Sequence, residues 1–209
     1  MSQLTWISMF LLLFISSCKS REISVREMIS SGIDSTEAGN HTAAIRIFSD
    51  ALKKDPWLQK GYYNRGIAYH AVRDYVKALA DFNHLERMMK KGGVIINRNN
   101  DIVSEEKEEW NVWYEDVIYW RAVTKADMDS LTSAYREFQY LIDNNYAESS
   151  NYYLWQGVLL GRSGNTEQAC EKFDQAWRTA KSAAAVKEAI DMLHQHCPEW
   201  KEATQGLKF

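Results

Sequence analysis

Proline and glycine are scarce in this sequence. Only two prolines and ten glycines occur among its 209 residues. A β-sandwich needs a turn roughly every dozen residues, and its turns favour these two residue types. The shortage argues against an all-β fold. Because Ala, Glu, Lys and Leu are abundant, it favours long helices joined by short connections.

An excess of basic residues is also missing. The formal net charge is -3, which argues against a dedicated nucleic-acid-binding protein. The apolar fraction is 45% and the charged fraction 25%, a balance that excludes a disordered chain. The length is sufficient for one or two domains with a substantial core.

Recognisable catalytic motifs are absent too. The sequence contains no Gly-rich phosphate loop, no G-x-S-x-G and no H-E-x-x-H. A metal site built from Cys170, Cys197, His194 and His196 is disfavoured, because residues two apart on a helix point nearly opposite ways. We therefore expect a protein that is not an enzyme and that holds no cofactor and no metal.

The N-terminal segment is uncharged over residues 1–17, and Trp6 to Ile15 form an apolar stretch interrupted only by Ser8. This stretch is shorter than the roughly 20 residues that span a bilayer, and it has the length of a signal-peptide core. We predict that it directs the chain out of the cytoplasm.

The residues that follow, Ile15-Ser16-Ser17-Cys18, resemble the lipobox of bacterial lipoproteins. The resemblance implies a signal peptide over 1–17, lipidation of Cys18 by acyl chains such as palmitate, and a tether over 18–24. It implies a lipid-anchored protein on the inner or outer membrane of the cell envelope, facing the periplasm or the surface. No Lys or Arg precedes the apolar core, which departs from the family pattern. An ordinary cleaved signal and an uncleaved anchor remain alternatives.

A spacing pattern recurs four times: a small residue, three residues, Phe, two residues, then Ala or Leu. Phe48 and Phe82 are 34 residues apart, Phe138 and Phe173 are 35 apart, and the middle step from Phe82 to Phe138 is 56. Small residues also recur twelve positions before the start of each pattern. The pattern and these small residues comprise Gly32, Ala44, Phe48, Ala51, Gly66, Ala78, Phe82, Leu85, Ala122, Ala134, Phe138, Leu141, Gly157, Ala169, Phe173 and Ala176.

A period of 34 is that of the tetratricopeptide repeat, a helix–turn–helix unit, and residues 25–180 resemble this family. The resemblance implies an all-α, right-handed superhelical solenoid of about four repeats plus a C-terminal capping helix. In such a repeat a small residue lies where the paired helices approach, and an aromatic ring fills the space beside it. The third repeat departs from the family, with Arg121 and Lys125 where Leu and Tyr are usual.

The repeat register predicts both domains and helices. We assign 25–90 to repeats one and two, 91–112 to an insertion with an extended helix start, 113–181 to repeats three and four, and 182–209 to a capping helix and tail. The insertion is either a tolerated surface loop or a binding loop. The predicted helices cover 25–37, 41–54, 59–71, 75–91, 105–127, 131–144, 150–162, 166–180 and 183–196.

In this family, the first helices of the repeats line a concave groove that holds a partner's peptide or helix. By register, the groove residues are Tyr63, Asn64, Ile67, His70, Tyr119, Trp120, Leu154 and Trp155, with further positions at Arg26, Ile29, Ile33, Lys60, Asp116, Val123, Asn151 and Val158. The alternative is that these rings pack between repeats. The carboxylate-clamp subtype is excluded, because only Asn64 matches its pattern.

Cys170 and Cys197 lie on two helices expected to form an antiparallel hairpin that turns near residue 182. Their distances from the turn differ by about 4–5 Å along the helix axis, which suits a disulfide. Two buried free thiols are the alternative.

These features predict a non-catalytic protein–protein interaction scaffold or assembly factor, anchored in the envelope by its lipid. The expected partner is another envelope protein that places a peptide or helix in the groove. A structural subunit that oligomerises through its outer faces, and a regulatory module that binds a peptide or peptidoglycan fragment, remain alternatives.

Overall fold

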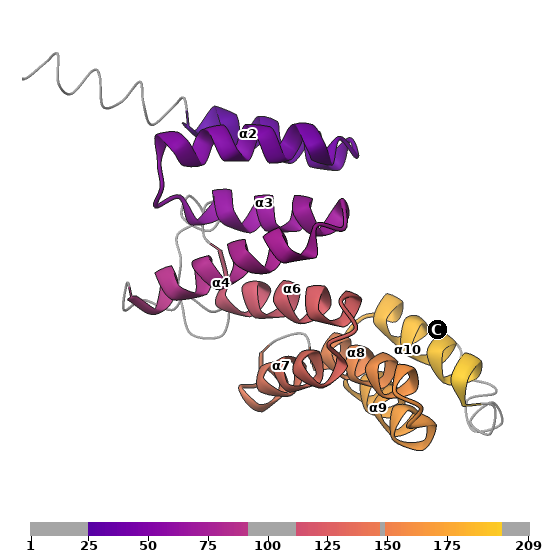
Figure 1. Ribbon diagram of the computed structural model, residues 1–209. Coiled ribbons are helices and arrows are strands. Elements are labelled where there is room, and N and C mark those ends of the chain that lie inside the picture. The colour runs from indigo at the N-terminus through magenta and orange to yellow at the C-terminus, as the bar shows by residue number, and fades with distance from the viewer. Residues whose placement is uncertain (1–24, 92–111, 147–148, 198–209) are drawn as a thin grey trace, which may run out of the picture. The chain divides into compact units, whose positions relative to one another are not determined.

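The computed structural model describes residues 25–91, 112–146 and 149–197, and within these ranges the chain forms helices and the turns between them (Figure 1). The predicted signal peptide, Cys18, the tether, most of the insertion and the tail lie outside the described residues. In the described part of the chain, no helix combines the length and the hydrophobicity needed to cross a membrane.

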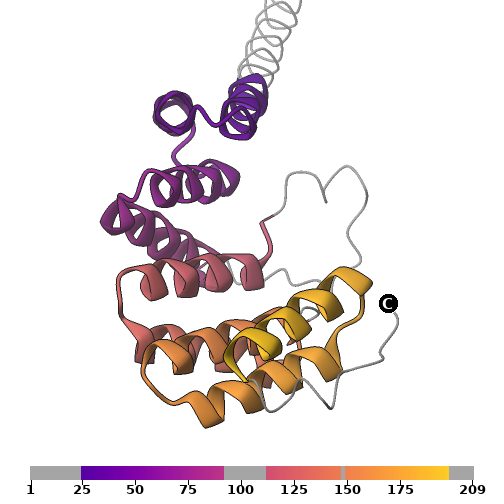
Figure 2. The same cartoon turned by 90° about the vertical axis from the view of Figure 1, so that its right-hand side faces the viewer.

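The chain forms two compact units, the first ending at Asp81 and the second beginning at Phe82. The N-terminal unit contains a helix over residues 25–37, α2 (His41–Lys54), α3 (Gln59–Ala71) and the start of α4 (Tyr75–Lys91). The C-terminal unit contains the rest of α4, α6 (Tyr114–Asp127), α7 (Leu131–Asp143), α8 (Ser149–Arg162), α9 (Thr166–Thr179) and α10 (Ala183–His196). In that unit α6 packs on α7, α7 on α8, α8 on α9, and α10 on both α9 and α8 (Figure 2).

The helix boundaries follow the register predicted from the repeat, with one correction. A helix over 105–127 is wrong, because α6 begins only at Tyr114 and the two residues before it are not helical. Trp113 has an extended backbone with φ -78° and ψ 139°. Glu115 and Asp116 lie in the first turn, where acidic side chains stabilise a helix start. The Glu-rich segment at 105–109, on which the earlier start was based, lies outside the described residues.

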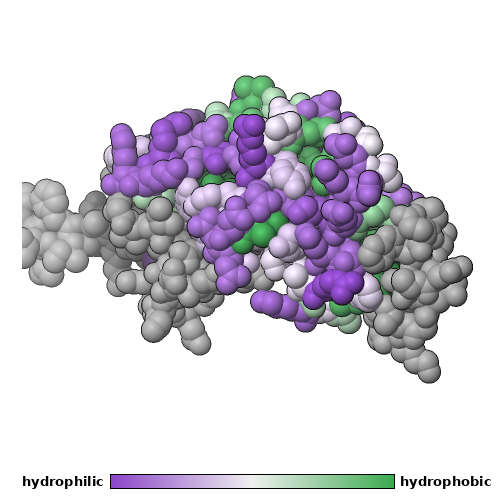
Figure 3. Space-filling model, turned by 90° about the horizontal axis from the view of Figure 1, so that it is seen from below, coloured by the Kyte–Doolittle hydropathy of each residue, from purple (hydrophilic) through white to green (hydrophobic). Residues whose placement is uncertain are grey.

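The recurring residues of the repeat lie in the core, together with aliphatic side chains such as Ile118 and Leu159. All four phenylalanines of the pattern, Phe48, Phe82, Phe138 and Phe173, are at most 1% exposed. Two of these rings lie so close to the backbone of the neighbouring helix that only glycine fits there. A Cβ atom on Gly32 would lie 2.3 Å from Phe48, and one on Gly157 would lie 2.4 Å from Phe173. Hydrophilic residues predominate over the coloured part of the face in Figure 3, with smaller apolar patches between them.

Candidate functional site

A pocket of about 730 Å³ lies in the C-terminal unit, with α8 and α10 as its main walls. The α8 side contributes Asn151, Leu154, Trp155 and Val158, which share one face because they follow the three-, four- and seven-residue spacing of a helix. The other lining residues are Tyr119, Ser150, Thr179, Lys181, Ser182, Ala184, Ala185, Glu188 and Met192.

The structure brings together five positions that the register assigned to the groove. They are Tyr119 from the third repeat and Asn151, Leu154, Trp155 and Val158 from the fourth. All five are partly exposed, as a lining residue must be. Trp120 is also partly exposed but is not among the residues that line this pocket.

Trp155 is the largest side chain of the pocket, and two contacts fix it. Its ring stacks on Phe138 with 5.7 Å between centroids and an interplanar angle of 7°. Its Nε1–H donates a hydrogen bond to the Tyr119 hydroxyl oxygen at 3.1 Å. A ring held in this way loses little conformational entropy when a ligand binds against it.

Tyr119 joins the pocket to the core of the repeats. Its ring lies 6.0 Å from Phe138, 6.3 Å from Tyr152 and 5.9 Å from Trp120, measured between centroids. Packing between repeats and lining a pocket were alternatives in the sequence analysis. Tyr119 and Trp155 do both, because each presents only part of its surface to the pocket.

The polar side chains at the rim hydrogen-bond to the protein itself. The Ser150 hydroxyl donates to the Ala176 carbonyl and the Thr179 hydroxyl to the Gln175 carbonyl, both at 2.8 Å. The Ser182 side chain caps α10 by accepting from the backbone N–H of Ala185. Leu154, Trp155, Val158 and Met192 therefore leave the pocket with a mostly apolar lining, to which exposed Lys181 and Glu188 add one positive and one negative charge.

The predicted groove residues of the N-terminal unit lie elsewhere. Tyr63, Asn64, Ile67 and His70 are partly exposed on α3, and the pocket contains none of them. The Asn64 side-chain amide donates to the Lys60 carbonyl at 2.8 Å, and the His70 ring lies 5.4 Å from that of Tyr75. The pocket beside Trp155 is therefore built from residues of the C-terminal unit alone.

Two other residues that the repeat register assigned to the groove do not lie there. Ile29 is fully buried and Val123 is 5% exposed, so both belong to the core. A shift of one position along a helix turns its side chains by about a quarter of a turn, enough to move an edge position from the groove to the interior.

Sequence reasoning missed the α10 wall of the pocket. Ala184, Glu188 and Met192 follow one another at four-residue spacing and so present one face of α10 to α8. The sequence predicted α10 only as a cover for the last repeat. The small residues at its start were the available signal that another chain could approach it closely.

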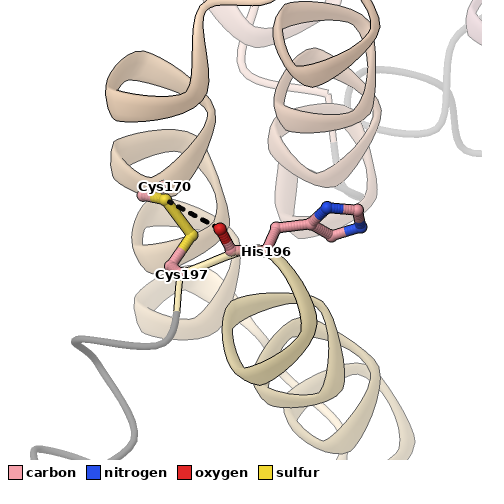
Figure 4. Close-up of a disulfide and its surroundings, with 3 residues drawn as sticks. All are labelled: Cys170, His196 and Cys197. Carbon is pink, nitrogen blue, oxygen red and sulfur yellow. Dashed lines mark hydrogen bonds between the residues drawn. A yellow bond between two sulfur atoms is a disulfide. The ribbon is translucent and has the colours of Figure 1, made fainter.

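A disulfide between Cys170 and Cys197 joins α9 to the end of α10 (Figure 4). The two Cα atoms are 5.9 Å apart, and the residues are 4% and 0% exposed. The predicted bond is therefore present in the structure, and the alternative of two free thiols is not.

No family model and no curated protein matches this sequence. Solved structures do match it. YrrB, described as a TPR protein with an unusual peptide-binding site, has a TM-score of 0.52 and 16% identity over 81% of this chain and 86% of its own. MamA has a TM-score of 0.54 and 16% identity over 88% and 97%, and the MamA RS-1 ArsTM double mutant has 0.57 and 11% over 83% and 97%. Together with the helix pairs and their packing, these similarities show that the chain has an all-α tetratricopeptide-repeat fold.

Proposed function

We propose that this chain is a non-catalytic protein-binding module that holds an extended peptide of a partner protein in the pocket between α8 and α10. The observation that carries the proposal is the convergence of five register-predicted groove positions on one pocket. The peptide-binding site named for YrrB supports a peptide as the ligand.

The lining defines the chemistry of the peptide. Leu154, Trp155, Val158 and Met192 offer apolar surface that suits one large aliphatic or aromatic side chain. Lys181 and Glu188 also line the pocket, and their charges suit polar or charged residues that flank this side chain. We therefore expect a peptide with an apolar anchor residue between polar neighbours.

A pair of neighbouring alanines provides the test. Ala184 lines the pocket, whereas Ala183 is exposed on the same helix but does not line it. A peptide is first selected on the purified chain from a random-peptide phage library, and its Kd is measured by fluorescence anisotropy. Ala184→Trp places a large ring on the pocket wall and should weaken binding by at least about tenfold, or about 1.4 kcal/mol.

Ala183→Trp adds the same ring one residue away and should leave the Kd unchanged. Equal Kd values for the two variants would place the peptide outside this pocket. A library that yields no peptide specific for the folded chain would contradict the proposal as a whole.

The module acts, in this proposal, at the cell envelope through a lipid on Cys18. The lipobox-like residues before Cys18 support the anchor. The disulfide supports export, because such bonds persist in oxidising compartments. Two or three acyl chains are enough for stable membrane attachment.

Membrane fractionation in the native bacterium tests the anchor. Cys18→Ala should move the protein out of the membrane fraction, while Ser20→Ala, in the tether, should not. Membrane association of Cys18→Ala that survives carbonate extraction would rule out the lipid as the anchor.

A further inference from the structure

The wall that α10 forms is held mainly by the second half of the helix. Ala184 and Glu188, which face the pocket, are exposed. The buried residues of α10 are Ala189, Ile190 and Leu193, and Cys197 follows directly after its last turn. The position of Ala184 and Glu188 therefore depends on the packing of the buried residues in the rest of α10.

The attachment is a small apolar cluster that contains the disulfide. The cluster consists of Ala169, Cys170, Phe173, Leu193 and Cys197, all at most 4% exposed. Phe173 also lies against Gly157 of α8 and 5.7 Å from the His196 ring, so it contacts both walls of the pocket. The disulfide is the covalent link within this cluster, between α9 and the end of α10 (Figure 4).

Two side chains connect the cluster to the pocket. Val158 of α8 and Met192 of α10 pack against the cluster and also line the pocket. A displacement of Cys197 away from Cys170 would move Leu193 and Met192 with it, because all three lie within about one and a half turns of α10. The disulfide and the pocket are thus connected through direct contacts.

We propose that the Cys170–Cys197 disulfide is a positioning element of the binding site, which keeps α10 in place as the wall opposite α8. This proposal rests on the proposed function, because it takes the ligand of the site to be a peptide. Without the bond, α10 leaves the wall position for part of the time, and the pocket is complete only in the remaining fraction. The apparent Kd rises by the inverse of that fraction, so a wall that is docked for one tenth of the time weakens binding about tenfold.

Hydrogen exchange tests the positioning without any ligand. Reduction by a dithiol breaks the S–S bond, transfers two electrons and two protons to give two thiols, and converts the dithiol to its disulfide. The oxidised chain, the chain refolded with dithiothreitol, and the double variant Cys170→Ala/Cys197→Ala are compared. We expect faster amide exchange over 183–196 in the last two, and unchanged exchange over 25–81.

Equal exchange over 183–196 in the oxidised and reduced chains would overturn the proposal. The reduced wild-type chain provides the comparison if the double variant fails to fold. Reoxidation should restore slow exchange, which a damaged or misfolded sample would not show.

Peptide binding tests the consequence, with the library-selected peptide as the probe. All Kd values are measured well below the lowest melting transition in the set. The reduced chain and the double variant should bind about tenfold more weakly than the oxidised chain. Phe48→Leu, which loosens the packing of the N-terminal unit against Gly32, serves as the control and should bind normally.

The two proposals fail in different ways. If the library yields no specific peptide, the proposed function is wrong, whatever the exchange rates show. If a peptide binds in the pocket with equal Kd in the oxidised and reduced chains, the proposed function stands and the positioning role of the disulfide is wrong.

Discussion

At the scale of residues, three polar side chains occupy one repeat position and make the same kind of contact, two of them buried and the third, Arg65, partly exposed. Arg65, Arg121 and Gln156 each donate to a residue on the second helix of the preceding repeat, at 3.0–3.3 Å. The acceptors, in the same order, are Ser49, Asn83 and Gln139, which also share one repeat position. Polar bonds of this kind fix the register between repeats, because a slipped neighbour would leave a buried donor unpaired.

The sequence marked Arg121 and Lys125 only as departures from the family. In the structure, Arg121 pairs with Glu86 and with Glu137, and Lys125 also pairs with Glu137. The partners could not be predicted, because Glu86 precedes the insertion and many acidic residues lie at comparable distances along the chain. The sequence showed that charged residues occupy these two positions, but it did not show which acidic residues they contact.

Replacing Arg121 tests this network. Arg121→Leu restores the usual residue of the family but leaves Glu86 and Glu137, whose side chains are 17% and 14% exposed, without the guanidinium. We expect the free energy of unfolding to fall by about 3 kcal/mol, measured by urea denaturation. Arg121→Leu/Glu137→Leu should recover part of this loss, because apolar side chains then replace the ion pair. A single variant as stable as the wild type would show that the pair contributes nothing net.

The stability should also depend on pH through Glu86. Burial alone would raise the pKa of Glu86, but hydrogen bonds from Lys90, Arg121 and Tyr114 outweigh it and lower the pKa from 4.5 to about 2. The unfolded state therefore binds this proton first as the pH falls, and the stabilisation by the carboxylate is complete above about pH 5 and is lost towards pH 2. Glu86→Gln should be less stable than the wild type at pH 7 by up to about 3 kcal/mol, and this difference should shrink steadily below pH 5. A difference that does not change between pH 7 and pH 3 would contradict the lowered pKa.

At the scale of elements, the first helices of the repeats end in the same turn. In α3 the backbone N–H of Arg73 bonds to the His70 carbonyl and that of Asp74 to the Tyr69 carbonyl, both at 2.9 Å. Arg73 thereby has a positive φ of 62°, and the corresponding residues Gly39, Asp129 and Gly164 have φ of 76°, 60° and 86°. The sequence indicated this turn at the two glycines, because glycine adopts positive φ at little cost. Arg gives no such signal and Asp only a weak one, so the repeat register located the other two turns.

A glycine at position 73 should therefore stabilise the chain. Arg73→Gly removes the steric cost of a positive φ, and we expect the free energy of unfolding to rise by about 0.5–1 kcal/mol. Arg73→Ala is the matched control, since it removes the same long side chain but keeps a Cβ atom. The control should give no gain in a urea titration. A gain of equal size in both variants would attribute the effect to the lost side chain and not to the backbone.

At the scale of the whole molecule, the repeat period predicted the fold class and nearly all helix boundaries. It could do so because the same spacing of small and aromatic residues occurs in every repeat. It predicted one side of the candidate site, including Tyr119, Leu154 and Trp155. It could not predict the other side, because α10 follows the last repeat and has no repeat position from which its contacts could be inferred. The disulfide was predictable from helix geometry, since the hairpin of α9 and α10 places its two cysteines at nearly equal distances from the turn.

The central claim is that a peptide binds between α8 and α10. The most direct measurement is photo-crosslinking of the library-selected peptide, with a benzophenone at its apolar anchor position, followed by mass spectrometric mapping of the modified residues. The account predicts crosslinks on the pocket face of α8, at Leu154, Trp155 or Val158, and on α10 at Met192. Crosslinks confined to α3, or to the part of the chain outside this pocket, would contradict it.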